Sequence, residues 1–243
     1  MKDLFSIQSA EYAKYRPTYP NELFNYLRQI SSEKDFAWDC GTGNGQAALE
    51  LAKVFKNVIA TDLSQNQIAN AQKAQNIEYR IGSAEDSGLA THSINLITVA
   101  QAIHWFKHEA FFAVVKRILR PGGVLAFWCY QLAEVDKIID KSVFTLYEGV
   151  LGPYWEKERK HVDDGYKNVV VPFEEIITPS FCIRTSWSLE QYIGYLSTWS
   201  ALQACIQKNN SNPLKDFYPE LKESWGKELK AVSWKISLRA FQL

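Results

Sequence analysis

The chain has 243 residues, with 27 basic and 27 acidic side chains, so its formal net charge is zero. Hydrophobic residues make up 47% and charged residues 22%, which is typical of a globular protein with a substantial core. A neutral chain creates no overall field that favours nucleic acid or anionic membranes. The composition therefore argues against a protein that binds such polyanions through bulk charge.

The four cysteines lie far apart and form no CxxC pair, so the sequence predicts neither a zinc cluster nor a disulfide framework. The N-terminal segment lacks the apolar stretch of a signal peptide. No run approaches the roughly 18 apolar residues that a membrane span needs. We therefore expect a reduced, cytoplasmic protein that does not contact a membrane.

Short apolar runs alternate with helical patterns between residues 36 and 129. The runs predict five strands, at Phe36–Asp39, Val58–Asp62, Ile77–Ile81, Ile94–Ala100 and Val124–Cys129. Apolar residues at helical spacing follow the first of these runs and precede the last. This alternation predicts an α/β fold with a mostly parallel sheet and helices on both faces.

Two local patterns place helix ends within this region. Ser64 followed three positions later by Gln67 is a capping-box pattern, which predicts that a helix starts just after Asp62. The stretch from Arg120 to Gly123, Arg-Pro-Gly-Gly, cannot continue a helix and permits a turn into the fifth strand.

The second half of the chain is less regular. Residues 131–172 indicate a mixed, mainly helical stretch, and Phe173–Trp187 contains a strand pattern broken by Pro179. Leu189–Ala204 predicts one helix, and Asn209–Pro213 has the composition of a loop. The closing AVSWKISLRAF alternates apolar and polar residues, as a final strand does.

Three glycines at alternate positions follow the first predicted strand, in the stretch DCGTGNGQ. A parallel sheet binds ligands at the carboxyl ends of its strands, and glycine permits close approach of the backbone. A dinucleotide site would need GxGxxG, but the third glycine, Gly45, comes one position early and position 46 is glutamine. The spacing therefore matches an NAD site poorly.

Asp62 ends the second predicted strand, seventeen positions after Gly45. A carboxylate there can accept hydrogen bonds from both hydroxyls of a ribose, although an acid that caps the following turn is the alternative. The stretch from Ser83 to Asp86 follows the third strand and is either an adenine-contacting segment or a solvated loop.

Taken together, DCGTGNGQ, ATDLS, GSAED, NLITVAQAIHWF and LRPGGVLAFW resemble, in this order and spacing, the motifs of class I S-adenosylmethionine-dependent methyltransferases. YAKYRPTYP, QAIHWF and YLSTWSA further resemble the type 11 group that includes trans-aconitate methyltransferases. The resemblance implies a Rossmann-like, seven-stranded, mostly parallel sheet with a helical insertion or lid.

The resemblance also implies one methyltransferase domain over residues 1–243. Residues 1–130 would form the cofactor-binding core with an N-terminal strap. Residues 131–185 would form the insertion or lid and the sixth strand, and residues 186–243 a helix and the final strand.

Position within the motifs implies a set of residues that bind S-adenosyl-L-methionine: Tyr15, Arg16, Asp39, Gly41, Gly43, Gly45, Asp62, Leu63, Gln67, Ala84, Glu85, Gln101 and Ala102. The glycines and Asp39 would line the methionine half, Asp62 would hold the ribose, and Ala84 and Glu85 would approach the adenine. Gln101 and Ala102 would pass close to the sulfonium. Arg16 would pair with the methionyl carboxylate, and Tyr12 and Tyr15 would fold over the site.

His104 is the candidate base because it lies beside the expected methyl donor, with a structural histidine as the alternative. His104 and His108 have the i,i+4 spacing of metal ligands, but no HExxH motif or third ligand accompanies them, so we expect no metal. Trp105, Tyr195 and Trp199 are candidates for the wall of an acceptor pocket. Arg16 and Arg184 are candidates to meet an anionic acceptor.

These patterns favour methyl transfer to an oxygen or carboxylate of a small-molecule acceptor, by a monomer or homodimer that binds no nucleic acid. Positioning, rather than a strong acid or base, would supply much of the rate, because a carboxylate acceptor has no proton to lose. The alternatives are an NAD-dependent oxidoreductase and a non-catalytic module that binds S-adenosylmethionine. A nucleic-acid methyltransferase is disfavoured by the neutral charge.

Overall fold

The computed structural model describes residues 15–243, and Tyr12, expected to fold over the site, lies outside this range. Its centre is one sheet whose strands, in chain order, are β1 (Phe36–Cys40), β2 (Asn57–Asp62), β3 (Ile77–Ile81), β4 (Ile94–Ala100), β5 (Leu119–Tyr130), β6 (Glu174–Ile176), β7 (Phe181–Trp187) and β8 (Lys230–Gln242). The five strands expected in the first half are all present, and β3 and β4 have the expected bounds.

Strand order in the sheet is β3-β2-β1-β4-β5-β8-β6, with β7 also paired to β8. The first five strands are parallel, whereas β8 runs antiparallel to β5, β6 and β7. Strand β6 pairs with residues 240–242 of β8 and β7 pairs with residues 230–236, so the two share one edge position. The sheet therefore has the seven strand positions that were expected, and its eight strands fit them because β6 and β7 occupy one position in turn.

The helices are α2 (Asn21–Ile30), α3 (Gln46–Ala52), α4 (Gln65–Ala69), α5 (His108–Ile118), α6 (Lys137–Phe144), α7 (Arg159–Asp163), α8 (Leu189–Ser197), α9 (Ser200–Asn209) and α10 (Leu214–Trp225). Short 3-10 turns η2 (Ile103–Trp105) and η4 (Gly152–Tyr154) and a π-helical turn η3 (Thr145–Val150) interrupt the connections. Helix α5 ends at Ile118, ahead of the Arg-Pro-Gly-Gly stretch, as expected. That stretch is not a separate turn, however, because β5 starts at Leu119 and includes it.

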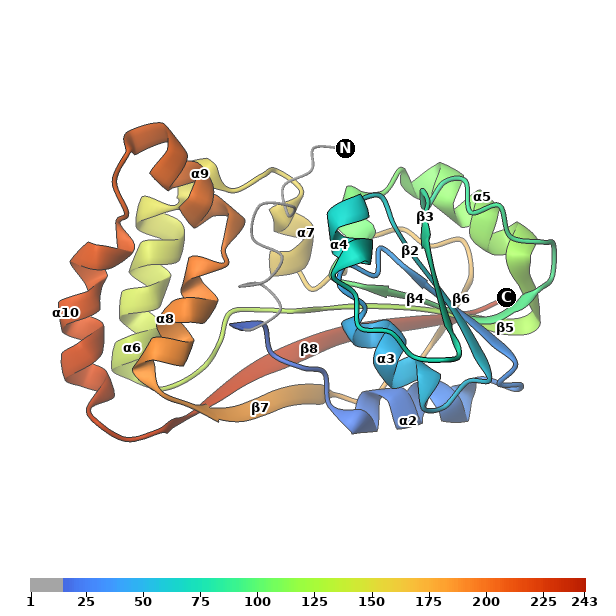
Figure 1. The fold of residues 1–243 in the computed structure, drawn as a ribbon, viewed down its shortest axis with the longest axis horizontal. Helices are drawn as coiled ribbons and strands as arrows, with labels where there is room; N and C mark the ends of the chain where they lie inside the picture. Colours follow the sequence, from blue (N-terminus) through green and yellow to red (C-terminus); the bar gives the residue numbers. More distant parts are fainter. Residues whose placement is uncertain (1–14) are drawn as a thin grey trace.

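Two separate groups of buried side chains lie on the two faces of the sheet. Helices α2 and α3 pack on one face through residues such as Leu27 and Leu51, and α5 packs on the other through residues such as Phe111 and Val115 (Figure 1). Successive residues of β1 alternate between the faces, since Ala37 belongs to the first group and Trp38 to the second. Both faces are covered, as a parallel sheet requires.

The C-terminal half adds a helical lobe that the sequence indicated only in part. Helices α6, α8, α9 and α10 gather at one end of the molecule, and the long strands β7 and β8 run from this lobe into the sheet (Figure 1). The single helix expected over Leu189–Ala204 is wrong. It is two helices, because Trp199 has an extended backbone and the Thr198 hydroxyl donates to the carbonyl of Tyr195.

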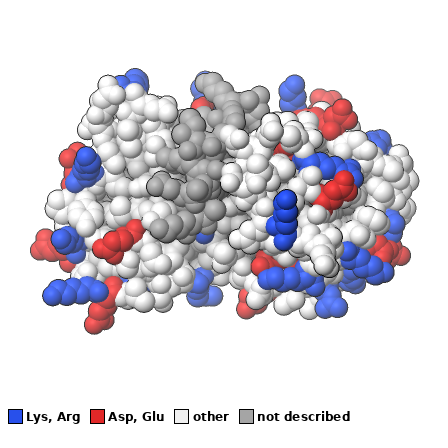
Figure 2. Space-filling view, in the orientation of Figure 1, with Lys and Arg blue, Asp and Glu red and all other residues white. Residues whose placement is uncertain are grey.

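The visible surface mixes basic and acidic side chains at both ends of the molecule, as the zero net charge suggests (Figure 2). No helix within residues 15–243 combines the length and apolar character that crossing a bilayer requires.

Candidate functional site

The glycine-rich loop lies at the carboxyl end of β1, next to the point where the sheet order reverses between β1 and β4. The amide groups of Gly41 and Thr42 both donate to the carbonyl of Thr61, which fixes the loop to the end of β2. Gly41, Gly43 and Gly45 have φ values of +70°, +55° and +86°, all in the left-handed region. The sequence therefore needs glycine here for conformation as well as for access.

The glycines differ in what surrounds them. A Cβ on Gly43 would meet nothing within 4 Å, so the backbone there faces open space. A Cβ on Gly41 would lie 2.7 Å from the Cβ of Ala102, and one on Gly45 would overlap the Tyr79 hydroxyl. Gly43 thus leaves room for a ligand, whereas Gly41 and Gly45 leave room for neighbouring side chains.

Asp39 lies beneath the loop rather than in the cavity. Its carboxylate is fully buried and accepts hydrogen bonds from the hydroxyls of Thr42 and Thr98. Burial raises the pKa of Asp39 to about 6, although the two threonine hydroxyls act in the opposite direction. The expectation that Asp39 lines the ligand site is therefore wrong: this side chain holds the loop from below.

Asp62 ends β2 with its carboxylate at the cavity. One oxygen accepts from the backbone N–H of Gly43 at 2.8 Å, and the other accepts from the N–H of Ser64 at 2.8 Å. Asp62 was expected either to bind a ribose or to cap the following turn. It caps the turn, and it also faces the cavity where a ribose could bind. The Ser64 hydroxyl accepts from the N–H of Gln67, and α4 starts at Gln65, as the capping pattern predicted.

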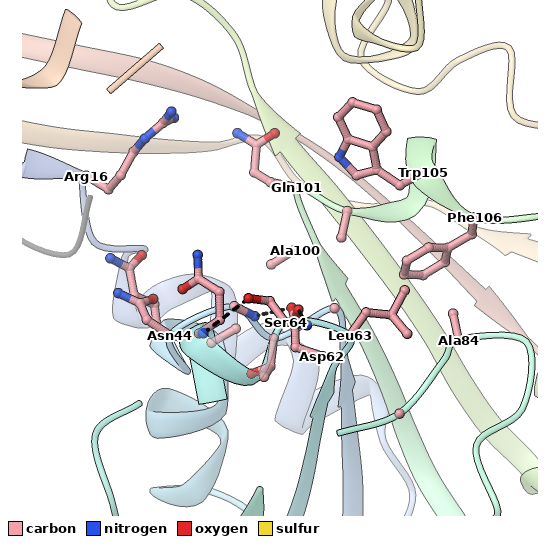
Figure 3. A pocket seen from close by; sticks show the side chains of 18 of the residues that line it. Arg16, Asn44, Asp62, Leu63, Ser64, Ala84, Ala100, Gln101, Trp105 and Phe106 are labelled. Carbon is pink, nitrogen blue, oxygen red and sulfur yellow. Dashed lines mark hydrogen bonds between the residues drawn. The ribbon is translucent and has the colours of Figure 1, made fainter. Parts of the chain in front are cut away.

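A cavity of about 150 Å³ opens above the glycine loop (Figure 3). Arg16, Gln101 and Trp105 lie along one side of it, opposite Asp62 and the loop (Figure 3). The sequence-predicted residues that line it are Arg16, Gly41, Gly43, Asp62, Leu63, Gln67, Ala84, Gln101 and Ala102.

Four predicted residues do not line this cavity: Tyr15, Asp39, Gly45 and Glu85. The ring of Tyr15 packs against α8, where a Cβ on Gly194 would lie 2.5 Å from it. Glu85 instead accepts hydrogen bonds from the Lys107 N–H and the Ser83 hydroxyl. Burial raises the pKa of Glu85, but these hydrogen bonds outweigh it and leave the pKa below its usual value.

Sequence reasoning missed several lining residues, among them Tyr19, Asn44, Ser64, Phe106 and Tyr130. All but Tyr130 lie inside the quoted motifs, so considering every residue of each motif could have found them. Tyr130 is different: it ends β5 and accepts a hydrogen bond from Arg16 across 114 positions of sequence. No local signal predicts that contact.

The buried amide of Gln67 offers one further clue to a ligand. Gln67 is only 4% exposed and lines the cavity, and its Oε1 accepts no hydrogen bond from the described residues. A buried acceptor without a partner is costly unless something else supplies a donor. Together with the open space at Gly43, this fits a polar ligand in the cavity.

A second, smaller chamber of about 60 Å³ adjoins the cavity. Arg16, Gln101 and Trp105 line both spaces. The residues that line the second chamber but not the cavity are His104, Trp155, Glu156, Arg159, Trp199 and Ser200.

Two of the three residues predicted to form the wall of an acceptor pocket line the second chamber. Trp105 and Trp199 line the second chamber, as expected, whereas Tyr195 does not. Tyr195 is 2% exposed, and its hydroxyl accepts from the indole N–H of Trp234. It instead supports Arg16, whose guanidinium carbon lies 5.6 Å from the Tyr195 ring centroid. Arg184, the other cationic candidate, is exposed on β7.

His104 lines the second chamber but not the first. Its Nδ1 lies 2.8 Å from the Tyr166 hydroxyl, and burial keeps that hydroxyl protonated by raising the pKa of Tyr166 well above its usual value. Burial, with a smaller contribution from the charge of Arg159, lowers the pKa of His104 to about 3. The imidazole is therefore neutral and weakly basic.

The two histidines that share a helical spacing are both engaged elsewhere. His104 meets Tyr166, and Nε2 of His108 lies 3.0 Å from the carbonyl of Ile103. Across residues 15–243, no three His, Cys, Asp or Glu side chains converge in a way that could hold a metal ion.

The chain is similar to known proteins over most of its length. The methyltransferase domain family matches residues 38–127, which include the glycine loop and strands β1 to β5. A candidate methyltransferase of Dictyostelium discoideum is 41% identical over 234 residues, covering 95% of this chain and 88% of that protein. CRG1 of Saccharomyces cerevisiae, a candidate S-adenosylmethionine-dependent methyltransferase, is 28% identical over 97% of this chain and 94% of its own length.

A solved structure agrees over the same extent. A candidate type II methyltransferase from Anaeromyxobacter dehalogenans superposes with a TM-score of 0.88 at 38% identity, covering 94% of this chain and 98% of that one. The chain therefore belongs to the class I S-adenosylmethionine-dependent methyltransferases, and S-adenosylmethionine is its cofactor.

Proposed function

We propose that this methyltransferase transfers a methyl group to a carboxylate oxygen of a small molecule held in the second chamber. The observation that carries the proposal is the continuity of the two spaces, which share Arg16, Gln101 and Trp105. The second chamber, at about 60 Å³, is smaller than the cofactor cavity, at about 150 Å³. The chamber therefore suits a small acceptor rather than a polymer.

The larger cavity has the groups that S-adenosylmethionine needs. Asp62 would accept hydrogen bonds from the ribose, and Arg16 would pair with the methionyl carboxylate. The unpartnered Oε1 of Gln67 would accept a hydrogen bond from the bound molecule, and the open backbone at Gly43 would lie against it. With these contacts the sulfonium end would lie toward Gln101, at the junction with the second chamber.

When bound, S-adenosylmethionine supplies an electrophilic methyl group: an oxygen lone pair of the acceptor forms the new O–CH₃ bond, the S–CH₃ bond breaks, and its electron pair stays on sulfur. A carboxylate has that lone pair without losing a proton, so the products are a methyl ester and S-adenosylhomocysteine. The described residues would align the acceptor and exclude water.

The state of His104 supports a carboxylate over an alcohol. An alcohol must lose its proton during transfer, and the best general base has a pKa near the working pH. His104, with a pKa of about 3 and Nδ1 held by Tyr166, is a poor base. We therefore assign His104 to the chamber wall.

The proposed lid includes the start of α9 as well as the residues 131–185 that were expected from the sequence. Trp155, Glu156 and Arg159 would close the chamber from one segment, and Trp199 and Ser200 from the other.

The test follows the methyl group chemically. The protein is incubated with methyl-labelled S-adenosylmethionine and a panel of small carboxylic acids and alcohols, and the products are treated with alkali. We expect label in acid-derived products that alkali releases as methanol, since esters hydrolyse and ethers do not. Label that resists alkali, or cofactor binding without transfer to any carboxylate, would contradict the proposal.

A further inference from the structure

The second chamber contains a cation, Arg159, that does not touch the cofactor cavity. Arg16 lines both spaces and donates to the Tyr130 hydroxyl and the Thr198 carbonyl. Arg159 lines only the second chamber, from the first residue of α7. Its side chain is 24% exposed, so it is largely enclosed by protein yet accessible from the chamber.

Neighbouring groups fix the position of Arg159. Its guanidinium carbon lies 4.9 Å from the ring centroid of Trp155 and 5.6 Å from that of Tyr147. Its Nε donates to the Tyr147 hydroxyl at 2.9 Å and to Asp163 at 3.3 Å, and the Tyr147 hydroxyl in turn donates to Asp163 at 2.7 Å. One edge of the guanidinium is therefore held by this triad.

The other edge of the guanidinium has no partner among the residues that the structure describes. Within residues 15–243, neither terminal nitrogen of Arg159 donates a hydrogen bond or forms an ion pair. A guanidinium presents its donors as a planar fork that matches the two oxygens of a carboxylate. The guanidinium of Arg159 is already fixed in position, and its terminal nitrogens are available. It can therefore bind a carboxylate without the entropic cost of ordering the side chain.

The charged and aromatic residues that line the chamber indicate which class of acceptor it suits. Among the described residues that line the chamber, Arg16 and Arg159 are positive and Glu156 is negative. Because Arg16 would pair with the methionyl carboxylate, Arg159 is the cation left for an acceptor. His104 adds none, because its pKa is about 3. The indoles of Trp105, Trp155 and Trp199 provide flat apolar walls, and the Trp155 and Trp199 rings lie 5.8 Å apart.

We infer that Arg159 is the acceptor-binding residue of the chamber, and that the acceptor is a small monocarboxylic acid with a flat, unsaturated or aromatic body. One carboxylate oxygen would pair with Arg159, and the other would face the junction at Gln101. Glu156 would disfavour a second negative charge. This inference rests on the proposed function and specifies the substrate class of the same site.

The test measures binding as well as turnover. Protein loaded with S-adenosylhomocysteine is titrated with benzoate, with its uncharged analogue benzamide and with the dianion phthalate, and quenching of tryptophan fluorescence reports occupation of the indole-lined chamber. We expect benzoate to bind more tightly than either of the other two. Equal binding of benzoate and benzamide, or no binding of benzoate, would overturn the inference.

Substitutions test whether Arg159 is the residue that binds benzoate. Arg159→Met is expected to weaken benzoate binding about 10- to 100-fold and to leave benzamide unchanged, as loss of a charge-assisted hydrogen bond requires. Lys160→Met, which removes an exposed charge at the next position, is the matched control and should change neither. Arg159→Lys keeps the charge and should restore part of the affinity if Arg159→Met proves unstable.

Glu156→Gln tests the charge count independently. It should improve phthalate binding by about two- to fivefold and improve benzoate binding less. If Arg159→Met binds benzoate as tightly as the Lys160→Met control does, the inference fails, and the proposed methyl transfer to a carboxylate is not affected. If S-adenosylhomocysteine itself does not bind, the proposed function fails instead, so the two failures are distinguishable.

Discussion

The cofactor cavity and the second chamber lie side by side, yet they are built in different ways. Strand ends and the loops that directly follow them supply most of the cavity, including Gly43, Asp62, Ala84 and Gln101. The second chamber combines residues from distant parts of the chain, such as His104, Arg159 and Trp199. The first arrangement is fixed by a local motif and sheet topology, whereas the second depends on how the helical segments pack.

This difference predicts that the groups beneath the glycine loop affect folding, and that the groups facing the spaces affect binding. Asp39 gives the largest expected effect. Its pKa of about 6 in the folded protein exceeds the ordinary aspartate pKa of 3.8, so the native state binds more protons than the unfolded state between these pH values. The contribution of Asp39 to stability therefore falls as pH rises, by about 3 kcal/mol from pH 3 to pH 7.

Urea unfolding of the wild type and Asp39→Asn at pH 5 and pH 7 measures this contribution. Other carboxylates have their own pH dependence, so the informative quantity is the difference between the two proteins. We expect Asp39→Asn to gain stability relative to the wild type as pH rises. An unchanged difference would contradict the assignment of a raised pKa to Asp39.

Asp62 faces the cavity, so its change should act on the cofactor. Asp62→Asn leaves one oxygen to serve Gly43, Ser64 and the ribose, and we expect it to weaken S-adenosylmethionine binding by about 1.5–3 kcal/mol. Calorimetric titration measures the affinity. Asp216→Asn, in an exposed position on α10 away from the cavity, is the control and should bind normally. Equal affinities for the two variants would remove Asp62 from the site.

The glycines allow a comparison within one loop. Gly43→Ala and Gly45→Ala both place a Cβ at positive φ, but only the Gly45 substitution overlaps Tyr79. We expect Gly45→Ala to lose about 1–3 kcal/mol more unfolding free energy than Gly43→Ala. Gly43→Ala should instead lose cofactor affinity. Chemical denaturation and calorimetry of both variants check this, and the reverse ranking in stability would contradict the packing described for Tyr79.

His104 gives the smallest expected effect. If it is part of the chamber wall, His104→Gln changes kcat/KM for a carboxylate acceptor by less than about tenfold, whereas loss of a general base costs about 100- to 10,000-fold. Steady-state kinetics across pH 5–9 distinguishes the two. If kcat/KM instead fell by about 100-fold or more, and the wild-type rise of kcat/KM with pH near neutrality were absent in the variant, His104 would be identified as a base.

The same contrast explains what could be predicted from the sequence. The five parallel strands and the start of α4 carry strong local patterns, and the structure confirms them. The glycine spacing also pointed to the correct sheet edge. Asp39 and Gly45 were misplaced because a motif shows which residues come together, but not which of them lie under the loop.

The second chamber could not be predicted in the same way. Arg159 occurs in the charged stretch Glu156–Lys160, where nothing local distinguishes it from Lys157 or Lys160. Its role depends on the contact of α7 with Tyr147 and on the break between α8 and α9 that turns Trp199 inward. Both are outcomes of tertiary packing, which override local propensity.

The most direct test of the account is a crystal structure of the protein with S-adenosylhomocysteine and benzoate. We predict the ribose on Asp62, the sulfur facing the junction at Gln101, and the carboxylate of benzoate within hydrogen-bond distance of Arg159. A sulfur that faces away from the second chamber, or a benzoate bound elsewhere while the chamber holds only water, would contradict it.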